Sequence, residues 1–204
     1  MPLPIDEKWL YEPTELTQSS TPFLVIMMGL SGSGKSTASG MIAHEFQAAW
    51  VCADVVRKRL YGLRPEQSSK AAGLNIYSPA AHKKTFTQMG SLAHTLLESG
   101  YSVILDSAAL RAIDRRQFID IAKKLKTTCA IVYCKAQEST INKRLCNRLK
   151  KPGAASEATV DIMKQQLDWL EEPCSIDAPL LISLNTDHLF WQDELKRQLE
   201  HHGI

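Results

Sequence analysis

A glycine-rich segment near the N-terminus carries the clearest chemistry in this sequence. Residues 29–37 read GLSGSGKST and fit the pattern G-x-x-x-x-G-K-[ST] in full. Glycines at these positions let successive backbone N–H groups converge on an anion, and the lysine can reach β- and γ-phosphates. We therefore predict a phosphate-binding loop for ATP, in which a serine hydroxyl helps to hold Mg²⁺. The predicted contacts are Gly29, Ser31, Gly32, Ser33, Gly34, Lys35, Ser36 and Thr37.

A second acidic position suits the metal that accompanies a nucleotide. Asp106 directly follows the apolar run 102–105. An aspartate that closes a buried strand beside the phosphate loop holds Mg²⁺ directly or through water in P-loop proteins. We therefore predict that Ser36 and Asp106 share the Mg²⁺ site.

Asp54 is the candidate general base for a hydroxyl acceptor. It ends the apolar run 49–53, at the edge of a sheet where open α/β folds bind their ligands, and Arg57 lies one helical turn further on. Spacing alone leaves a second interpretation equally open, in which Asp54 only caps a helix and Arg57 is a surface charge.

These residues need a parallel sheet to bring them together. Short, near-continuously apolar runs alternate with longer amphipathic segments, a pattern typical of strands buried on both faces and joined by helical crossovers. We predict an α/β fold, a three-layer P-loop NTPase with a five-stranded parallel sheet. The expected strands are 23–28, 49–53, 102–105, 128–134 and 180–184, and the expected helices are 36–46, 55–61, 79–99, 111–125, 137–149, 156–173 and 187–201.

Composition limits the classes of protein that fit. The 204 residues are 44% hydrophobic and 23% charged with a formal net charge of +2, which excludes a disordered chain and argues against a dedicated nucleic-acid binder. The longest apolar run, 23–30, is too short to span a bilayer, and the first ten residues lack the features of a signal peptide. We expect an irregular lead-in over 1–20, one domain over 21–204, and a cytoplasmic location.

Cysteine usage agrees with a reducing compartment. The five cysteines form no C-x-x-C pair, so we expect neither disulfides nor a zinc site. Cys52, Cys129 and Cys134 lie in strand-like stretches and are expected to be buried.

Several segments beyond the phosphate loop resemble one family. They are ADVVRKRLYG (53–62), NIYSPAA (75–81), GYSVILDSAALRAIDRR (100–116), KRLCNRLK (143–150) and DWLEEP (168–173). From about residue 23 to 187 the chain resembles the bacterial predicted kinases with a P-loop AAA-type ATP-binding domain. That group is similar to polynucleotide 5′-hydroxyl kinases, and more distantly to zeta toxins and to shikimate and gluconate kinases.

The resemblance implies roles for residues on both sides of the site. It matches Asp54 to the acid that activates the acceptor hydroxyl and Arg57 to the arginine that holds the acceptor. It also matches Asp106 to the aspartate at the strand end. Ser-Ala-Ala-Leu follows Asp106 here, whereas many relatives carry Thr or Asn, so an acceptor contact at these positions is in question.

The resemblance further implies a nucleoside-kinase-like architecture with a helical lid at about residues 144–158. Arg144 and Arg148, four residues apart on one helix face, would fold over the ATP phosphates, and Arg148 with Lys35 would stabilise the transferring group. Arg115 and Arg116 are expected to be surface charges.

Three functions fit these observations. The first is transfer of the γ-phosphate of ATP to a hydroxyl of a small molecule, with Asp54 as the base. The second keeps this chemistry but uses a 5′-hydroxyl of RNA or DNA, which the modest net charge disfavours. The third is a nucleotide-binding regulatory module without acceptor-dependent turnover. The sequence does not identify the acceptor or the oligomeric state.

Overall fold

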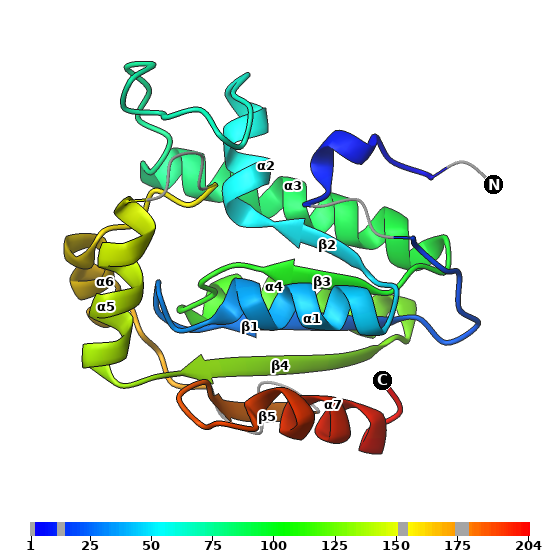
Figure 1. Ribbon diagram of the computed structural model, residues 1–204. Helices are drawn as coiled ribbons and strands as arrows, with labels where there is room; N and C mark the ends of the chain where they lie inside the picture. Colours follow the sequence, from blue (N-terminus) through cyan, green and yellow to red (C-terminus); the bar gives the residue numbers. More distant parts are fainter. Residues whose placement is uncertain (1–2, 12–14, 151–154, 174–179) are drawn as a thin grey trace.

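A parallel sheet forms the centre of the molecule. The computed structural model describes residues 3–11, 15–150, 155–173 and 180–204. The strands of the described chain are β1 (Phe23–Met28), β2 (Ala49–Cys52), β3 (Val103–Asp106), β4 (Thr128–Lys135) and β5 (Leu180–Asn185). All the strand pairs are parallel, in the order β2-β3-β1-β4-β5 (Figure 1). The predicted α/β fold with five parallel strands is confirmed.

The central strand β1 shows why a nearly continuous apolar run predicts a buried strand. All six of its residues are buried, with β3 paired on one side and β4 on the other. Leu24, Ile26 and Met28 belong to one hydrophobic cluster, and Phe23, Val25 and Met27 belong to the cluster on the opposite face. Side chains alternate across a strand, so each face of the sheet needs its own covering layer.

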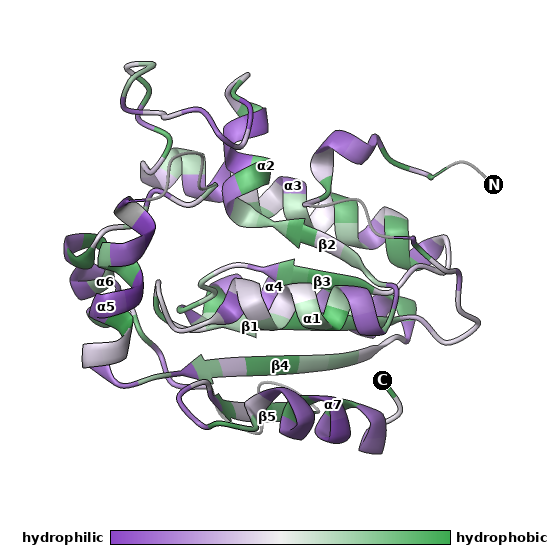
Figure 2. Ribbon diagram, viewed as in Figure 1, coloured by the Kyte–Doolittle hydropathy of each residue, from purple (hydrophilic) through white to green (hydrophobic). Residues whose placement is uncertain are grey.

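Helices supply these two layers. Helices α3 (Pro79–Glu98) and α4 (Ala112–Leu125) pack on one face, and α1 (Lys35–Glu45) and α7 (Trp191–His201) cover the other. Hydrophobic residues colour the strands green in Figure 2, while the outer helices show purple polar surfaces. The result is the three-layer arrangement that the alternating pattern predicts.

The remaining helices lie at the carboxyl end of the sheet. Helix α2 (Ala53–Leu60) directly follows β2, and α5 (Glu138–Leu149) and α6 (Val160–Leu167) lie beyond the tips of β1 and β4 (Figure 1). The loops that leave the carboxyl ends of parallel strands meet at this edge, which is where α/β folds of this kind bind ligands.

Residues at both ends of the long helix α3 mark its boundaries, as the sequence predicts. Ser78 caps it by accepting a hydrogen bond from the Ala81 N–H at 3.2 Å, and Pro79 occupies its first turn. Gly100 follows its C-terminus with φ +83°, a backbone conformation that favours glycine.

Two predicted helices are shorter than expected. The helix predicted from Ser156 to Pro173 spans only Val160–Leu167, because Thr159 provides the cap. Beyond it, the Glu171 N–H donates to the Leu110 carbonyl at 3.0 Å, which draws the chain out of the helical path. The helix predicted to begin at 187 begins at Trp191.

One predicted surface charge is wrong. Arg115 is only 1% exposed and donates to the carbonyl oxygens of Ala109 and Leu110 at 3.0 and 2.8 Å, whereas Arg116 is exposed as expected. The helix α4 turns Arg115 inward beneath the loop that follows β3. The two carbonyl oxygens accept hydrogen bonds from Nη1 of this buried arginine and partly compensate its burial.

The N-terminal residues pack onto the domain. A short 3₁₀ helix (Glu7–Trp9) precedes Leu10, which is buried in the core. The Tyr11 N–H donates to the Trp50 carbonyl at 2.9 Å, and the two rings meet edge to face. Of the helices in the described ranges, none has the length and apolar character needed to span a membrane.

Candidate active site

The phosphate loop joins β1 to α1 with little spare room. Gly29, Gly32 and Gly34 all have φ between +86° and +137°. A Cβ at Gly29 would overlap the Cys134 carbonyl oxygen, and one at Gly34 would lie 3.0 Å from the Thr186 methyl group. The loop therefore needs glycine both for its backbone angles and for close packing.

Lys35 and Asp106 interact electrostatically beside this loop. The Lys35 Nζ donates to the Leu30 carbonyl at 2.9 Å. Burial lowers the pKa of Lys35, and the negative charge of Asp106 partly offsets this effect. Burial also raises the pKa of Asp106, against the opposing influence of Lys35, Ser36 and Trp50, whose indole Nε1 donates to the carboxylate at 3.2 Å. Both charged groups are therefore poorly hydrated. A bound phosphate and a bound cation would each supply an opposite charge to one of them.

Distant segments hold the loop in its shape. The Gln166 side-chain oxygen of α6 accepts from the Ser31 N–H at 2.8 Å. The Thr186 hydroxyl, just after β5, donates to the Ser33 carbonyl at 2.8 Å. Sequence reasoning missed Gln166 and Thr186, because neither belongs to a local motif.

Asp54 and Arg57 form an ion pair on the first turns of α2. Arg57 is buried, and its guanidinium lies 5.0 Å from the centre of the Tyr77 ring. Asp54 is partly exposed and lines the cavity described below. Asp54 makes no side-chain cap on α2, whose N-cap is Cys52, so the interpretation of Asp54 as a helix cap is wrong.

The two arginines of α5 have different environments. Arg144 is held by the Thr186 hydroxyl and carbonyl at 2.9 and 3.1 Å and by the Gly32 carbonyl at 3.3 Å. Arg148 also lines the cavity, and its charge contributes to lowering the pKa of Lys35. In the described structure Arg144 is therefore bound to the phosphate loop and to the segment after β5, and Arg148 lies close enough to Lys35 to affect its pKa. The Pro152 and Gly153 of the predicted lid lie outside the described residues.

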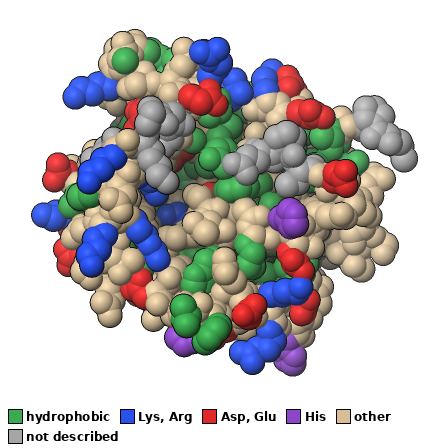
Figure 3. Space-filling view, viewed as in Figure 1, with side chains coloured by type: hydrophobic (Ala, Val, Ile, Leu, Met, Phe, Trp, Pro, Cys, Tyr) green, Lys and Arg blue, Asp and Glu red, His purple; other side chains and the backbone are tan. Residues whose placement is uncertain are grey.

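A single cavity of about 1370 Å³ brings the predicted residues together. Hydrophobic side chains show inside the hollowed front of the molecule, and Lys and Arg side chains gather near α5 (Figure 3). Gly29 and Ser33 do not line the cavity. The predicted residues that do are Ser31, Gly32, Gly34, Lys35, Ser36, Thr37, Asp54, Arg57, Asp106, Arg144 and Arg148.

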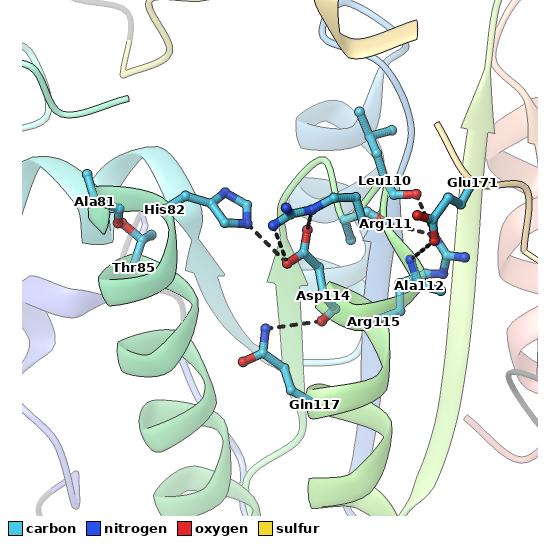
Figure 4. Close-up of polar contacts among 11 residues, drawn as sticks. Ala81, His82, Thr85, Leu110, Arg111, Ala112, Asp114, Arg115, Gln117 and Glu171 are labelled. Atoms are coloured by element: carbon cyan, nitrogen blue, oxygen red, sulfur yellow. Dashed lines mark hydrogen bonds and ion pairs between the residues drawn. The ribbon is translucent and has the colours of Figure 1, made fainter. Parts of the chain in front are cut away.

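A polar cluster that sequence reasoning missed lies along the same cavity. Asp114 on α4 accepts from Arg111 Nε and Nη2 at 2.9 and 3.0 Å, and it lies 3.1 Å from His82 Nε2 on α3 (Figure 4). The i, i+3 spacing of Arg111 and Asp114 is a local signal for their ion pair. Nothing in the sequence indicates that His82 joins them.

The residues present fit a nucleotide with Mg²⁺. The glycines let the loop pack closely against Cys134, Ile141 and Thr186 with positive φ angles, and Lys35 donates to the Leu30 carbonyl within it. Ser36 is exposed and interacts with Asp106, so the two offer the oxygen donors that Mg²⁺ prefers. The described residues contain no cluster of three or more His, Cys, Asp or Glu side chains suited to a metal.

These features define a P-loop nucleotide-binding domain with a kinase-like fold. The family model described as an AAA domain matches residues 24–173, which is most of the chain. The chain therefore belongs to this AAA domain family, and the coarser part of the predicted resemblance is confirmed.

Curated relatives in mycobacteria share this part of the chain. The uncharacterized protein Rv2004c of Mycobacterium tuberculosis (strain H37Rv) is 32% identical over 169 residues, and so is Mb2027c of Mycobacterium bovis. Each alignment covers 76% of this chain and 32% of the relative. The chain thus spans about a third of the length of the curated relatives that it matches.

Solved kinases share the fold. A gluconokinase from Sinorhizobium meliloti is 17% identical with a TM-score of 0.60, over 91% of this chain and 100% of that one. A sugar kinase from Janibacter is 19% identical with a TM-score of 0.63, over 90% and 95% of the two chains. The Mycobacterium tuberculosis APS kinase in complex with AMPPNP and APS is 21% identical with a TM-score of 0.61, over 89% and 99%.

Proposed function

We propose that this chain is an ATP-dependent phosphotransferase that acts on a hydroxyl of a small-molecule acceptor. The observation that carries the proposal is the position of Asp54. Asp54 lines the same cavity as the phosphate loop, and its charge acts on both Lys35 and Asp106. A carboxylate beside a phosphate site is placed to act on an attacking hydroxyl.

Each side chain has a defined role in this proposal. Lys35 and Arg148 bind the β- and γ-phosphates, and Arg57 orients the Asp54 carboxylate through their ion pair. Asp54 accepts the proton of the acceptor hydroxyl as the new oxygen–phosphorus bond forms and the bond to ADP breaks. Ser36 and Asp106 would hold Mg²⁺, which neutralises phosphate charge when bound. We also propose that residues 144–158 act as a lid.

A small acceptor is favoured over a nucleic acid. The net charge is only +2, and the gluconokinase and the sugar kinase share the fold. One observation supports the alternative, polynucleotide 5′-hydroxyl kinase. Tyr77 and Trp169 line the cavity with exposed rings, on which nucleic-acid bases could stack.

Asp54→Asn tests the proposal directly. ATP affinity should stay within a few-fold of wild type, while acceptor-dependent release of ADP should fall by about 10²- to 10⁴-fold because the proton acceptor is lost. The measurement is ADP release and product mass over a panel of polyols, sugars, sugar acids and 5′-hydroxyl oligonucleotides. Asp120→Asn, at an exposed position of α4, is the matched control and should behave as wild type.

Three outcomes would contradict all or part of the proposal. Normal transfer by Asp54→Asn would remove Asp54 as the base. ATP binding by the wild type without acceptor-dependent turnover anywhere in the panel would favour the regulatory module instead. Transfer to oligonucleotides alone would establish the nucleic-acid acceptor.

A further inference from the structure

The cavity extends past Asp54 to a second polar group that the phosphotransfer roles do not use. His82, Arg111, Asp114 and Gln117 line this part, which lies between the N-terminal ends of α3 and α4. Figure 4 shows His82 and Arg111 reaching the Asp114 carboxylate from different helices, with Gln117 one turn below.

The charged side chains in this group differ in how much they are exposed to solvent. The Asp114 side chain is 9% exposed, whereas those of Arg111 and His82 are 45% and 32% exposed. Hydrogen bonds from His82 and Arg111 outweigh burial and lower the pKa of Asp114, so the carboxylate is ionised at neutral pH. The carboxylate is therefore buried behind two donors that remain accessible from the cavity.

Besides linking α3 to α4, this arrangement leaves part of the Arg111 guanidinium available to a ligand. Arg111 uses Nε and Nη2 to bind Asp114, which leaves the N–H groups of Nη1 outside this pair. The His82 ring is stacked on Phe86 at 4.2 Å between centroids, and its second nitrogen points away from Asp114 (Figure 4). The Arg111 donor is thus held in a fixed orientation by Asp114, which His82 holds in turn, as a binding site requires.

The surroundings favour an anion. Lys83 also lines the cavity, and the first turns of α3 and α4 both open onto it. The N-terminal ends of the two helices carry partial positive charges that add to those of Arg111 and Lys83, while Asp114 and Glu171 offset part of this charge.

An unpartnered hydroxyl lies on the loop that leads to this group. The Ser107 Oγ is buried, lines the cavity and has no hydrogen-bond partner among the described residues. Buried hydroxyls are normally paired, so this one indicates a ligand contact. Arg115 holds the same loop from below, where Ala109 has φ +42°.

We propose that the acceptor carries an anionic group, a carboxylate or a phosphate, at a distance from its reacting hydroxyl. Arg111 binds this group through Nη1, Asp114 and His82 hold the guanidinium in position, and Ser107 contacts the acceptor. This inference rests on the proposed function and names the class of its acceptor.

The first experiment measures binding and needs no turnover. Radiolabelled sulfate is dialysed to equilibrium against the full chain saturated with AMPPNP and Mg²⁺, so that the phosphate loop is occupied. Arg111→Gln should weaken sulfate binding at least tenfold, and Arg111→Lys should weaken it less because the charge is kept. Arg116→Gln, one helical position beyond Arg115 and exposed, is the control and should bind as wild type. Equal binding by wild type and a folded Arg111→Gln protein would overturn the proposal.

The second experiment compares matched acceptors. Each pair consists of an aldonic acid and the alditol of the same chain length, assayed for ADP release. The wild type should prefer the acid at least tenfold in kcat/KM, through KM, and Arg111→Gln should lose this preference while Arg116→Gln keeps it. A preference for the neutral member would overturn the proposal.

The two experiments separate this inference from the proposed function. If no acceptor supports ADP release but sulfate binding depends on Arg111, the phosphotransferase proposal fails and the anion site stands. If transfer occurs and depends on Asp54 but shows no preference for acids, only the anion site fails.

Discussion

At the scale of single residues, the phosphate loop requires glycine at positions where a side chain would collide with neighbouring atoms. Gly29 and Gly62 both have positive φ, +137° and +73°. A Cβ at Gly29 would meet the Cys134 carbonyl oxygen and the Ser33 hydroxyl, whereas one at Gly62 would meet nothing within 4 Å. A side chain at Gly62 would therefore cause backbone strain alone, whereas one at Gly29 would also collide with neighbouring atoms.

Gly29→Ala should destabilise the protein far more than Gly62→Ala. Strain alone costs about 1–2 kcal/mol for an alanine at positive φ, and at Gly29 the overlap with backbone atoms adds to this cost. We expect a loss of about 3 kcal/mol or more for Gly29→Ala, measured by urea unfolding. Similar losses at the two positions would show that the close packing around Gly29 relaxes freely.

Asp106 illustrates a conflict between stability and function. Its carboxylate is buried, and burial raises its pKa above the ordinary value of 3.8. The charged form is therefore disfavoured in the folded protein, although the proposed metal site needs it.

Asp106→Asn should stabilise the ligand-free protein while it abolishes transfer. Below pH 3.8 the carboxyl is neutral in both the folded and the unfolded state, so the variant gains nothing over wild type from this effect. As pH rises from 3.8 through the raised pKa of Asp106 in the folded protein, the wild type loses stability relative to the variant. Above that pKa the difference in unfolding free energy between the two proteins is constant. Thermal unfolding at several pH values, with ADP release measured in parallel, checks both parts. A variant less stable than wild type at neutral pH would show that the attraction between Asp106 and Lys35 dominates.

At the scale of elements, Glu157 connects the acceptor side of the cavity to the segment that leads into α6. Its carboxylate accepts from the Ser69 N–H at 2.7 Å and the Ser69 hydroxyl at 2.6 Å, and the buried Lys58 ammonium lies 3.4 Å away. Lys58 also donates to the Pro65 carbonyl at 2.7 Å. The loop after α2 and the end of the proposed lid are therefore one connected unit.

Glu157→Ala should release the loop over residues 63–75. Its loss leaves the Ser69 N–H and hydroxyl without their acceptor and the buried Lys58 ammonium without its carboxylate, which costs about 1–3 kcal/mol locally. Hydrogen exchange should accelerate in this loop and in the first turn of α6, and change little in the sheet. Glu66→Ala, an exposed glutamate of the same loop, is the control. Unchanged exchange in the Glu157 variant would show that other contacts hold the loop.

At the scale of the whole molecule, the layers divide the four cysteines of the described ranges into two classes. Cys52, Cys129 and Cys134 lie in buried strands, as predicted, and Cys146 is exposed on α5. Burial raises the pKa of Cys129 and of Cys134 to about 12. Reactive thiolate is therefore suppressed wherever the sheet is covered on both faces.

Iodoacetamide should modify Cys146 in the native protein and reach the three strand cysteines only after unfolding. Peptide mass mapping after a short reaction at pH 8 measures each site separately, and the same reaction in urea is the control. Modification of a strand cysteine at the rate of Cys146 would indicate that the sheet opens readily.

The sequence alone determined the sheet, its covering helices and the phosphate loop. These features depend on local patterns: apolar runs encode strands buried on both faces, and Ser78, Pro79 and Gly100 mark the ends of α3. A glycine-rich loop between such a strand and a helix is likewise readable from neighbours in the chain.

Only the tertiary structure decided which side chains complete the site. His82 contacts Asp114, Gln166 contacts Ser31, and Arg144, which lines the cavity, is also bound to Thr186. The burial of Arg115 was also decided there, by the path of the loop after β3. Such contacts join residues far apart in the sequence, and they depend on how loops pack at the sheet edge. No local periodicity encodes that packing, because it follows from the fit of several elements at once.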